Sequence, residues 1–110
     1  MDAGLVGGAK EAALFHFIVL GSLTAQGTTT NADALKRADG VAQGAQAMGG
    51  RLIDIYWTLG KYDFVCLFEM PDAESMAALL MRVGAQGNIK TMTMRAFDRT
   101  EMPAILAKAG

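Results

Sequence analysis

One run of ten residues, Leu14 to Leu23 (LFHFIVLGSL), constrains the fold more than any other part of the chain. Both of its alternating sets of side chains are apolar, interrupted mainly by His16 and Ser22. A strand with this pattern is typical of the centre of a sheet, where both faces are covered. The run is too short to cross a bilayer as a helix. We therefore expect a sheet built around this strand.

Two further strand-like runs, Arg51–Leu59 and Tyr62–Met70, are separated only by a Gly-Lys pair. Glycine at the first loop position suits a tight type II′ hairpin. A four-residue loop that pairs Thr58 with Asp63 keeps the same parity. One face is then wholly apolar or aromatic and is expected to carry the helices: Ile53, Ile55, Trp57, Leu59, Tyr62, Phe64, Cys66 and Phe68. The other face is mixed: Leu52, Asp54, Tyr56, Thr58, Asp63, Val65, Leu67 and Glu69.

Helical spacing marks two segments between the strands. The first extends from Leu35 to Met48, and Thr30 with Asp33 resembles a cap that opens it. The second begins at Pro71-Asp72 and has an apolar stripe of Met76, Leu79, Leu80 and Val83.

The last strand-like run, Ile89–Phe97, has one polar and one apolar side. Thr91, Thr93 and Arg95 alternate with Met92, Met94 and Ala96. Thr100 and Pro103 then suit the start of a short terminal helix.

The order strand, helix, strand, strand, helix, strand predicts an α+β fold of the ferredoxin-like βαββαβ type, with an extra C-terminal helix. The sheet has four antiparallel strands, and both helices cover one face. Because the first strand is apolar on both sides, the other face would expose a patch on the order of several hundred Å², which monomers rarely tolerate. We therefore expect a homo-oligomer that forms through this face.

Length and charge limit the remaining possibilities. At 110 residues the chain fits one domain, placed at residues 14–110 after a flexible leader, residues 1–13. Ten basic and eleven acidic residues nearly cancel and form no basic cluster, so we expect neither nucleic acid nor a membrane as partner. The only cysteine, Cys66, allows no internal disulfide, which is typical of a cytoplasmic protein.

The segment Ile53–Met70, IDIYWTLGKYDFVCLFEM, resembles the signature of the GYD domain family of bacterial proteins, with the eponymous residues at Gly60, Tyr62 and Asp63. Further matches in the same order are FIVLGSLTAQG, Met48-Gly49-Gly50-Arg51, Pro71-Asp72 and Gly87-Asn88-Ile89-Lys90-Thr91 leading to Arg95-Ala96-Phe97. The resemblance implies a ferredoxin-like fold of the dimeric α/β-barrel type. It implies no particular reaction, substrate or cofactor.

Two residues are candidates for catalysis. His16 is the only histidine, and a cofactor-free acid/base enzyme would favour it because imidazole titrates nearest neutrality. Asp63 could act as a base on the mixed face. The alternatives are a core histidine with one satisfied nitrogen, and an aspartate that accepts hydrogen bonds from the neighbouring turn and Thr58.

Ligand binding on the mixed face would use Tyr56, Asp63, Thr93 and Arg95. Arg95 could grip a carboxylate or phosphate. It could instead pair across the sheet or the subunit boundary, with Asp54, Asp63 or Glu69 as partner.

Metal and cofactor signatures are weak. Eight methionines and one cysteine raise the idea of a soft-metal site, but methionine also fills core gaps, and zinc-type spacing is absent. We expect no metal and no cofactor.

Three functions remain open. The first is a homo-oligomeric module that binds a small organic ligand at or near the subunit interface. The second is a cofactor-free oxygenase or isomerase, by analogy of fold alone. The third is a structural assembly subunit with a dry interface.

Overall fold

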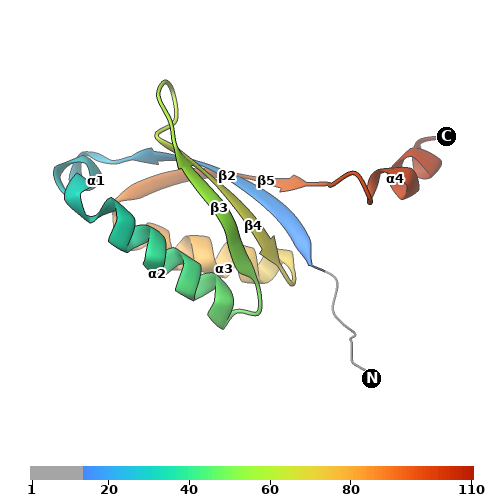
Figure 1. Ribbon diagram of the computed structural model, residues 1–110, viewed down its shortest axis with the longest axis horizontal. Coiled ribbons are helices and arrows are strands. Elements are labelled where there is room, and N and C mark those ends of the chain that lie inside the picture. Colours follow the sequence, from blue (N-terminus) through green and yellow to red (C-terminus); the bar gives the residue numbers. More distant parts are fainter. Residues whose placement is uncertain (1–13) are drawn as a thin grey trace.

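The computed structural model describes residues 14–110, and the expected flexible leader, residues 1–13, lies outside the described residues. Its strands are β2 (Phe15–Leu23), β3 (Arg51–Trp57), β4 (Phe64–Met70) and β5 (Ile89–Ala96). Its helices are α1 (Ala25–Thr29), α2 (Ala34–Ala47), α3 (Ala73–Gly84) and α4 (Met102–Ala109), with a short 3₁₀ turn, η1 (Asn31–Asp33), before α2. Figure 1 shows their arrangement.

The four strands form one antiparallel sheet in the order β3-β4-β2-β5. This order and the βαββαβ succession confirm the predicted ferredoxin-like fold. Helices α2 and α3 lie side by side against one face of the sheet, whereas α4 extends away from both layers beyond the end of β5 (Figure 1). The strand predicted at Leu14–Leu23, β2, is central, as its apolar pattern predicts.

The core lies between the sheet and the two helices. Every second residue of β2 and β4 is buried there: Phe17, Val19, Phe64, Cys66, Phe68 and Met70. Helix α3 adds Met76 and Leu79, and helix α2 adds Ala45. The intervening residues of β2 and β4 are only half-buried, because within residues 14–110 no layer covers the second face. We expected both faces of β2 to be buried; in a single chain only the face toward the helices is.

One of the two predicted helix starts is confirmed. The Asp72 carboxylate accepts a hydrogen bond from the backbone N–H of Ser75 at 2.7 Å and so caps α3. This bond lowers the pKa of Asp72. The predicted cap of α2 is wrong, because Asp33 makes no such bond at the start of that helix. The segment before α2 instead forms α1, whose cap is the Thr24 hydroxyl, 3.1 Å from the Gly27 N–H.

The β3–β4 hairpin has a four-residue loop rather than the tight type II′ turn. The Thr58 N–H donates to the Asp63 carbonyl at 2.9 Å, and this bond closes the loop one pair earlier than a two-residue turn would. Gly60 lies within the loop at φ 104°, a conformation that side chains with a Cβ rarely adopt.

An irregularity in β3 changes the predicted faces. The register shifts between Leu52 and Asp54, so that Leu52 pairs with Phe68 and packs against the core. Ile53 occupies the bulge and is 39% exposed. The assignment of Ile53 to the helix-covered face and of Leu52 to the opposite face is therefore wrong, because one extra residue inverts the alternation.

Two glycines test how tightly these elements are packed. A methyl group at Gly27 would collide with the backbone carbonyl of Asn88, which cannot swing aside as a side chain can. We expect Gly27→Ala to lower the free energy of unfolding by about 1–3 kcal/mol, as overpacking does. Gly40 in α2 has open space around it, so Gly40→Ala should raise that free energy by up to about 1 kcal/mol.

Urea unfolding of both variants measures the difference. Equal effects of the two substitutions would contradict the close approach of α1 to the segment before β5.

Candidate functional site

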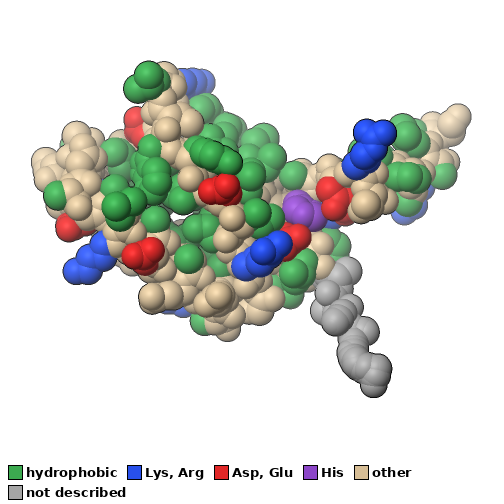
Figure 2. Space-filling view, in the orientation of Figure 1, with side chains coloured by type: hydrophobic (Ala, Val, Ile, Leu, Met, Phe, Trp, Pro, Cys, Tyr) green, Lys and Arg blue, Asp and Glu red, His purple; other side chains and the backbone are tan. Residues whose placement is uncertain are grey.

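The uncovered side of the sheet is an apolar surface. We define the open face as the apolar side chains that point away from the helices: Ile18, Leu20, Val65, Leu67, Met92 and Met94. In the strand register Ile18 lies between Leu67 and Met94, and the neighbouring rows of β2, β4 and β5 follow the same order. Met92 and Met94 are 53% and 40% exposed. Hydrophobic side chains gather over the strands in Figure 2.

Polar groups lie at one end of this face, around His16. The imidazole Nε2 is 3.1 Å from Glu69 Oε2 on the neighbouring strand, and Glu69 is also paired with Arg51 at 2.6 Å. On the other side, Nδ1 is 3.8 Å from Asp98 Oδ2 and 3.7 Å from Glu101 Oε1. We call His16, Glu69, Asp98 and Glu101 the His16 cluster. The histidine, purple in Figure 2, lies where the α4 segment leaves the body.

The turn before α4 holds two carboxylates of this cluster in place. Asp98 accepts hydrogen bonds from the Thr100 hydroxyl at 2.6 Å and from the Glu101 N–H at 3.1 Å. The Thr100 bond is the main reason that the pKa of Asp98 is lowered. Glu101 accepts from the Asp98 N–H at 3.0 Å, and this bond, followed by that from Arg95, lowers the pKa of Glu101.

Arg95 is a positioning residue of this turn. Its guanidinium pairs with Glu101 at 2.9 Å and donates to the backbone carbonyls of Ala96 and His16. It also lies over three aromatic rings, those of Phe15, Phe17 and Phe97, with 4.3 Å to the last. The expected partners Asp54, Asp63 and Glu69 are not the ones that it contacts.

The four predicted ligand-binding residues do not converge on one surface. Thr93 and Arg95 pair with Val19 and Phe17, so they share the side of the sheet that the helices cover. Tyr56 lies on the opposite side and is half exposed, and its hydroxyl donates to Asp54 at 2.9 Å. This bond raises the pKa of Tyr56. The expected placement of Thr93 and Arg95 on the mixed face is therefore wrong. The alternation within β5 does not show which of its sides faces the helices, because this depends on its register against β2.

Asp63 is also separated from His16. Its carboxylate accepts a hydrogen bond from the backbone N–H of Leu23 at 2.7 Å, rather than from Thr58. His16 and Leu23 stand at opposite ends of β2, and seven residues of strand span roughly 23 Å. The structure therefore does not bring the two catalytic candidates together.

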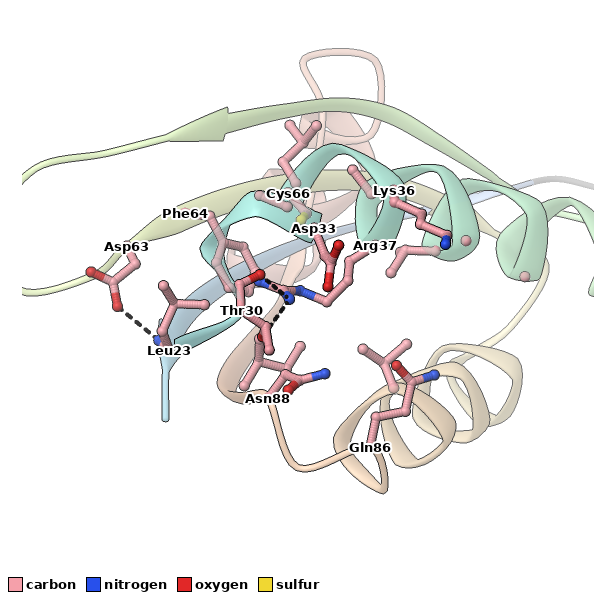
Figure 3. A pocket seen from close by; sticks show the side chains of 18 of the residues that line it. Leu23, Thr30, Asp33, Lys36, Arg37, Asp63, Phe64, Cys66, Gln86 and Asn88 are labelled. Atoms are coloured by element: carbon pink, nitrogen blue, oxygen red, sulfur yellow. Dashed lines mark hydrogen bonds between the residues drawn. The ribbon is translucent and has the colours of Figure 1, made fainter. Parts of the chain in front are cut away.

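A cleft that the sequence did not predict lies on the helix side of the sheet. It is a cleft of about 910 Å³ between α2 and α3, above the sheet. Its floor is largely apolar: Ile55, Trp57, Phe64, Cys66, Leu79 and Val83. Its rim is polar: Asp33, Lys36, Arg37, Asp63, Arg82, Gln86 and Asn88. Figure 3 shows Arg37 donating to Thr30, and Asp63 at the edge bonded to Leu23.

The sequence contained one signal of this cleft. Gly44 in α2 faces Leu79 of α3, where an added Cβ would lie 2.9 Å from a Leu79 methyl group. The two helices are therefore close at this point, and the cleft extends from it toward Lys36 and Arg82 at the N-terminal half of α2 and the C-terminal half of α3.

Comparison with known proteins identifies the family. The GYD domain matches residues 17–106 of the chain. The chain belongs to the GYD domain family. The resemblance of the segment around Gly60, Tyr62 and Asp63 is thereby confirmed.

A curated relative and solved structures agree with this assignment. The chain is 35% identical over 91 residues to the glutamine synthetase and cystathionine beta-lyase binding protein of Thermus thermophilus. The alignment covers 82% of this chain and 96% of that protein. Two solved regulators are similar in fold: MtbAldR, with a TM-score of 0.64 and 9% identity, and the leucine response regulatory protein of Mycobacterium tuberculosis, with 0.61 and 16%.

These two likenesses extend over 90% and 87% of the GYD chain, which spans about three fifths of each regulator (62% and 59%). They show the ferredoxin-like fold. Within residues 14–110, no helix has the length and apolar character to span a membrane.

The cleft floor contains the single cysteine of this GYD domain. Burial raises the pKa of the Cys66 thiol to about 12, from an ordinary value of 9.0. We expect native Cys66 to react with iodoacetamide at least about 100-fold more slowly at pH 8 than in urea, because the thiolate is the reactive form. Mass spectrometry of the quenched reaction gives both rates. Equal rates in the two states would contradict a buried thiol.

Proposed function

We propose that this GYD domain is a homodimeric, cytoplasmic binding module whose subunits pack open face against open face. The observation that carries this proposal is the apolar, uncovered side of the sheet. Two such faces packed together would lie about 10 Å apart and form a second core on the uncovered side. Ile18 and Leu20 of the central strand β2 would then be buried on that side as Phe17 and Val19 are on the other.

The C-terminal helix supports the same assembly. Leu106 of α4 is 61% exposed and Phe97, before the helix, is 53% exposed. Because α4 extends past the end of the sheet, no layer formed by residues 14–110 lies against it in Figure 1. A second subunit on the open face would place an apolar surface within its reach.

We propose that the partner of the dimer is a metabolic enzyme, with glutamine synthetase as the first candidate. The support is the Thermus relative, whose name states that it binds this enzyme and cystathionine beta-lyase, and which aligns over nearly its whole length. The geometry adds that a dimer formed through the open face keeps the helix side and the β3–β4 loop accessible. Leu59 in that loop and Met81 on α3 are exposed apolar groups there.

Two methionine substitutions test the dimer. Met94→Lys puts a charge on the open face beside Ile18 of the central strand, where a dimer would bury it without a partner. Met81→Lys makes the same change on the outside of α3, where the side chain is 75% exposed. We expect the first variant to sediment as a monomer and the second to remain a dimer. A wild-type chain that sediments as a monomer at micromolar concentration would overturn the proposal.

The Met94→Lys variant also connects the dimer to its partner. If the dimer is the binding unit, Met94→Lys should weaken binding to purified glutamine synthetase of the same source by at least about tenfold through lost bivalency. Surface plasmon resonance measures this. No binding by the wild-type protein would reject the enzyme as partner and leave the dimer untouched.

A second candidate function is the binding of a small amphiphilic carboxylic acid in the helix-side cleft. The observation that favours it is the combination of an apolar floor with Lys36 and Arg82 at the rim, both exposed to solvent. Pockets for small ligands commonly have a volume of about 300–1,000 Å³ and a few polar groups that set orientation. This site would lie on the opposite side of the sheet from the proposed interface.

Trp57 lines the cleft and is the only tryptophan, so its fluorescence reports on the occupant. We expect decanoate to change the emission saturably, and decanol, which lacks the charge, to bind more weakly. Replacing both Lys36 and Arg82 with Gln should lower the affinity for decanoate roughly fivefold or less, because exposed charges are screened. The control variant Lys108→Gln, on α4, should bind as wild type. An unsaturable response would reject the ligand.

The geometry does not favour the cofactor-free enzyme. Asp63 is far from His16 along β2, and the Arg95 guanidinium is already bound to Glu101 and two backbone carbonyls. A catalytic pair would need one of them to face the imidazole across a shared cavity.

A further inference from the structure

We propose that His16, Asp98 and Glu101 form a binding site for one divalent first-row transition ion, with Zn²⁺ as the reference ion. One ligand atom from each of the three residues lies within 4.8 Å of the other two. Two atoms bound to one tetrahedral Zn²⁺ at about 2.1 Å each lie about 3.4 Å apart. The distances from Nδ1 to the carboxylates, 3.8 Å and 3.7 Å, are slightly longer, so small movements of the side chains bring the atoms to this spacing.

The contact on the far side of the imidazole favours one ring nitrogen as the proton carrier. His16 Nε2 lies 3.1 Å from Glu69 Oε2. An ionised carboxylate has no proton to donate, so this contact favours the tautomer with the hydrogen on Nε2. The neutral imidazole then has a bare lone pair at Nδ1, directed at Asp98 and Glu101.

Nδ1 is the atom that requires an explanation. It is buried and has no hydrogen-bond partner among the described residues. A proton on Nδ1 would form ion pairs with the two facing carboxylates but no hydrogen bond, because their oxygens are 3.8 Å and 3.7 Å away. In the neutral ring the Nδ1 lone pair faces two carboxylate oxygens, which is unfavourable in a partly buried site. A cation bonded to all three removes this repulsion with small movements of the side chains.

The surrounding contacts resemble the outer shell of a metal site. Ligating histidines usually donate their other N–H to a carboxylate, which fixes the ring and raises its basicity. Glu69 fills this position, and Arg51 holds Glu69 from the other side at 2.6 Å. Arg95 binds the second oxygen of Glu101. Its positive charge disfavours a second cation, so we expect one ion per chain.

The donor set selects the class of ion. One imidazole nitrogen with two carboxylate oxygens suits Zn²⁺ and its neighbours, whereas Ca²⁺ and Mg²⁺ prefer oxygen alone and copper(I) prefers sulfur. Three protein ligands would leave at least one position for water. The bound ion would join the start of β2 to the turn before α4 and so fix the direction of that helix.

This inference is independent of the proposed dimer, and it is tested on the full chain without an affinity tag. The protein is freed of metal with EDTA and titrated with ZnCl₂ by calorimetry at neutral pH. We expect one ion per chain, no detectable binding by His16→Asn or Asp98→Asn, and affinity reduced about 10- to 100-fold by Glu69→Gln. The matched control is Asp39→Asn, which neutralises an exposed carboxylate on α2 far from the cluster in the sequence; it should bind as wild type.

A second measurement covers variants that fail to fold. Co²⁺ added to the metal-free wild-type chain should give visible absorption bands of a nitrogen–oxygen site, and Zn²⁺ should displace them. Absence of binding in the wild type, or unchanged binding by a folded His16→Asn variant, would overturn the site.

Discussion

The structure depends on an asymmetry across the central strand β2. Its side chains are largely apolar on both sides, yet residues 14–110 supply helices for only one side. A sheet buried on one face places Phe17 and Val19 in a packed core and leaves Ile18 and Leu20 half-covered. Each buried side chain of this size contributes about 1.5–3 kcal/mol, so a second layer would add substantially to stability. The proposed dimer follows from this imbalance more directly than from any single contact.

Most of the fold could be predicted because its signals are local. The alternation in the strands and the helical spacing from Leu35 to Met48 and from Met76 to Val83 depend only on neighbouring residues. Pro71 and Asp72 mark a boundary through their own backbone preferences and hydrogen bonds. Such signals predict the element order, and for six elements in the order βαββαβ few arrangements remain.

The wrong predictions concern which side of the sheet a residue faces, because this depends on the register between distant segments. The bulge at Ile53 exchanges the faces of Leu52 and its neighbour, and nothing within β3 itself indicates an extra residue. The side of Arg95 depends on its pairing with Phe17, which is 78 residues earlier in the chain. The predicted ligand site is wrong for the same reason. Tyr56 and Thr93 are both polar strand residues, but their side chains point to opposite sides of the sheet.

The His16 cluster shows the limit of searching by spacing. Metal sites recognised from sequence have ligands a few residues apart, whereas His16 meets Asp98 and Glu101 only because β2 and β5 are adjacent. That position also connects the two main surfaces of the protein. The cluster lies where the open face ends and the turn before α4 begins, so a group bound there would influence how α4 is directed toward the second subunit of the proposed dimer. The polar end of the sheet and its apolar centre would then act together, the first orienting the helix and the second providing the area that the helix helps to cover.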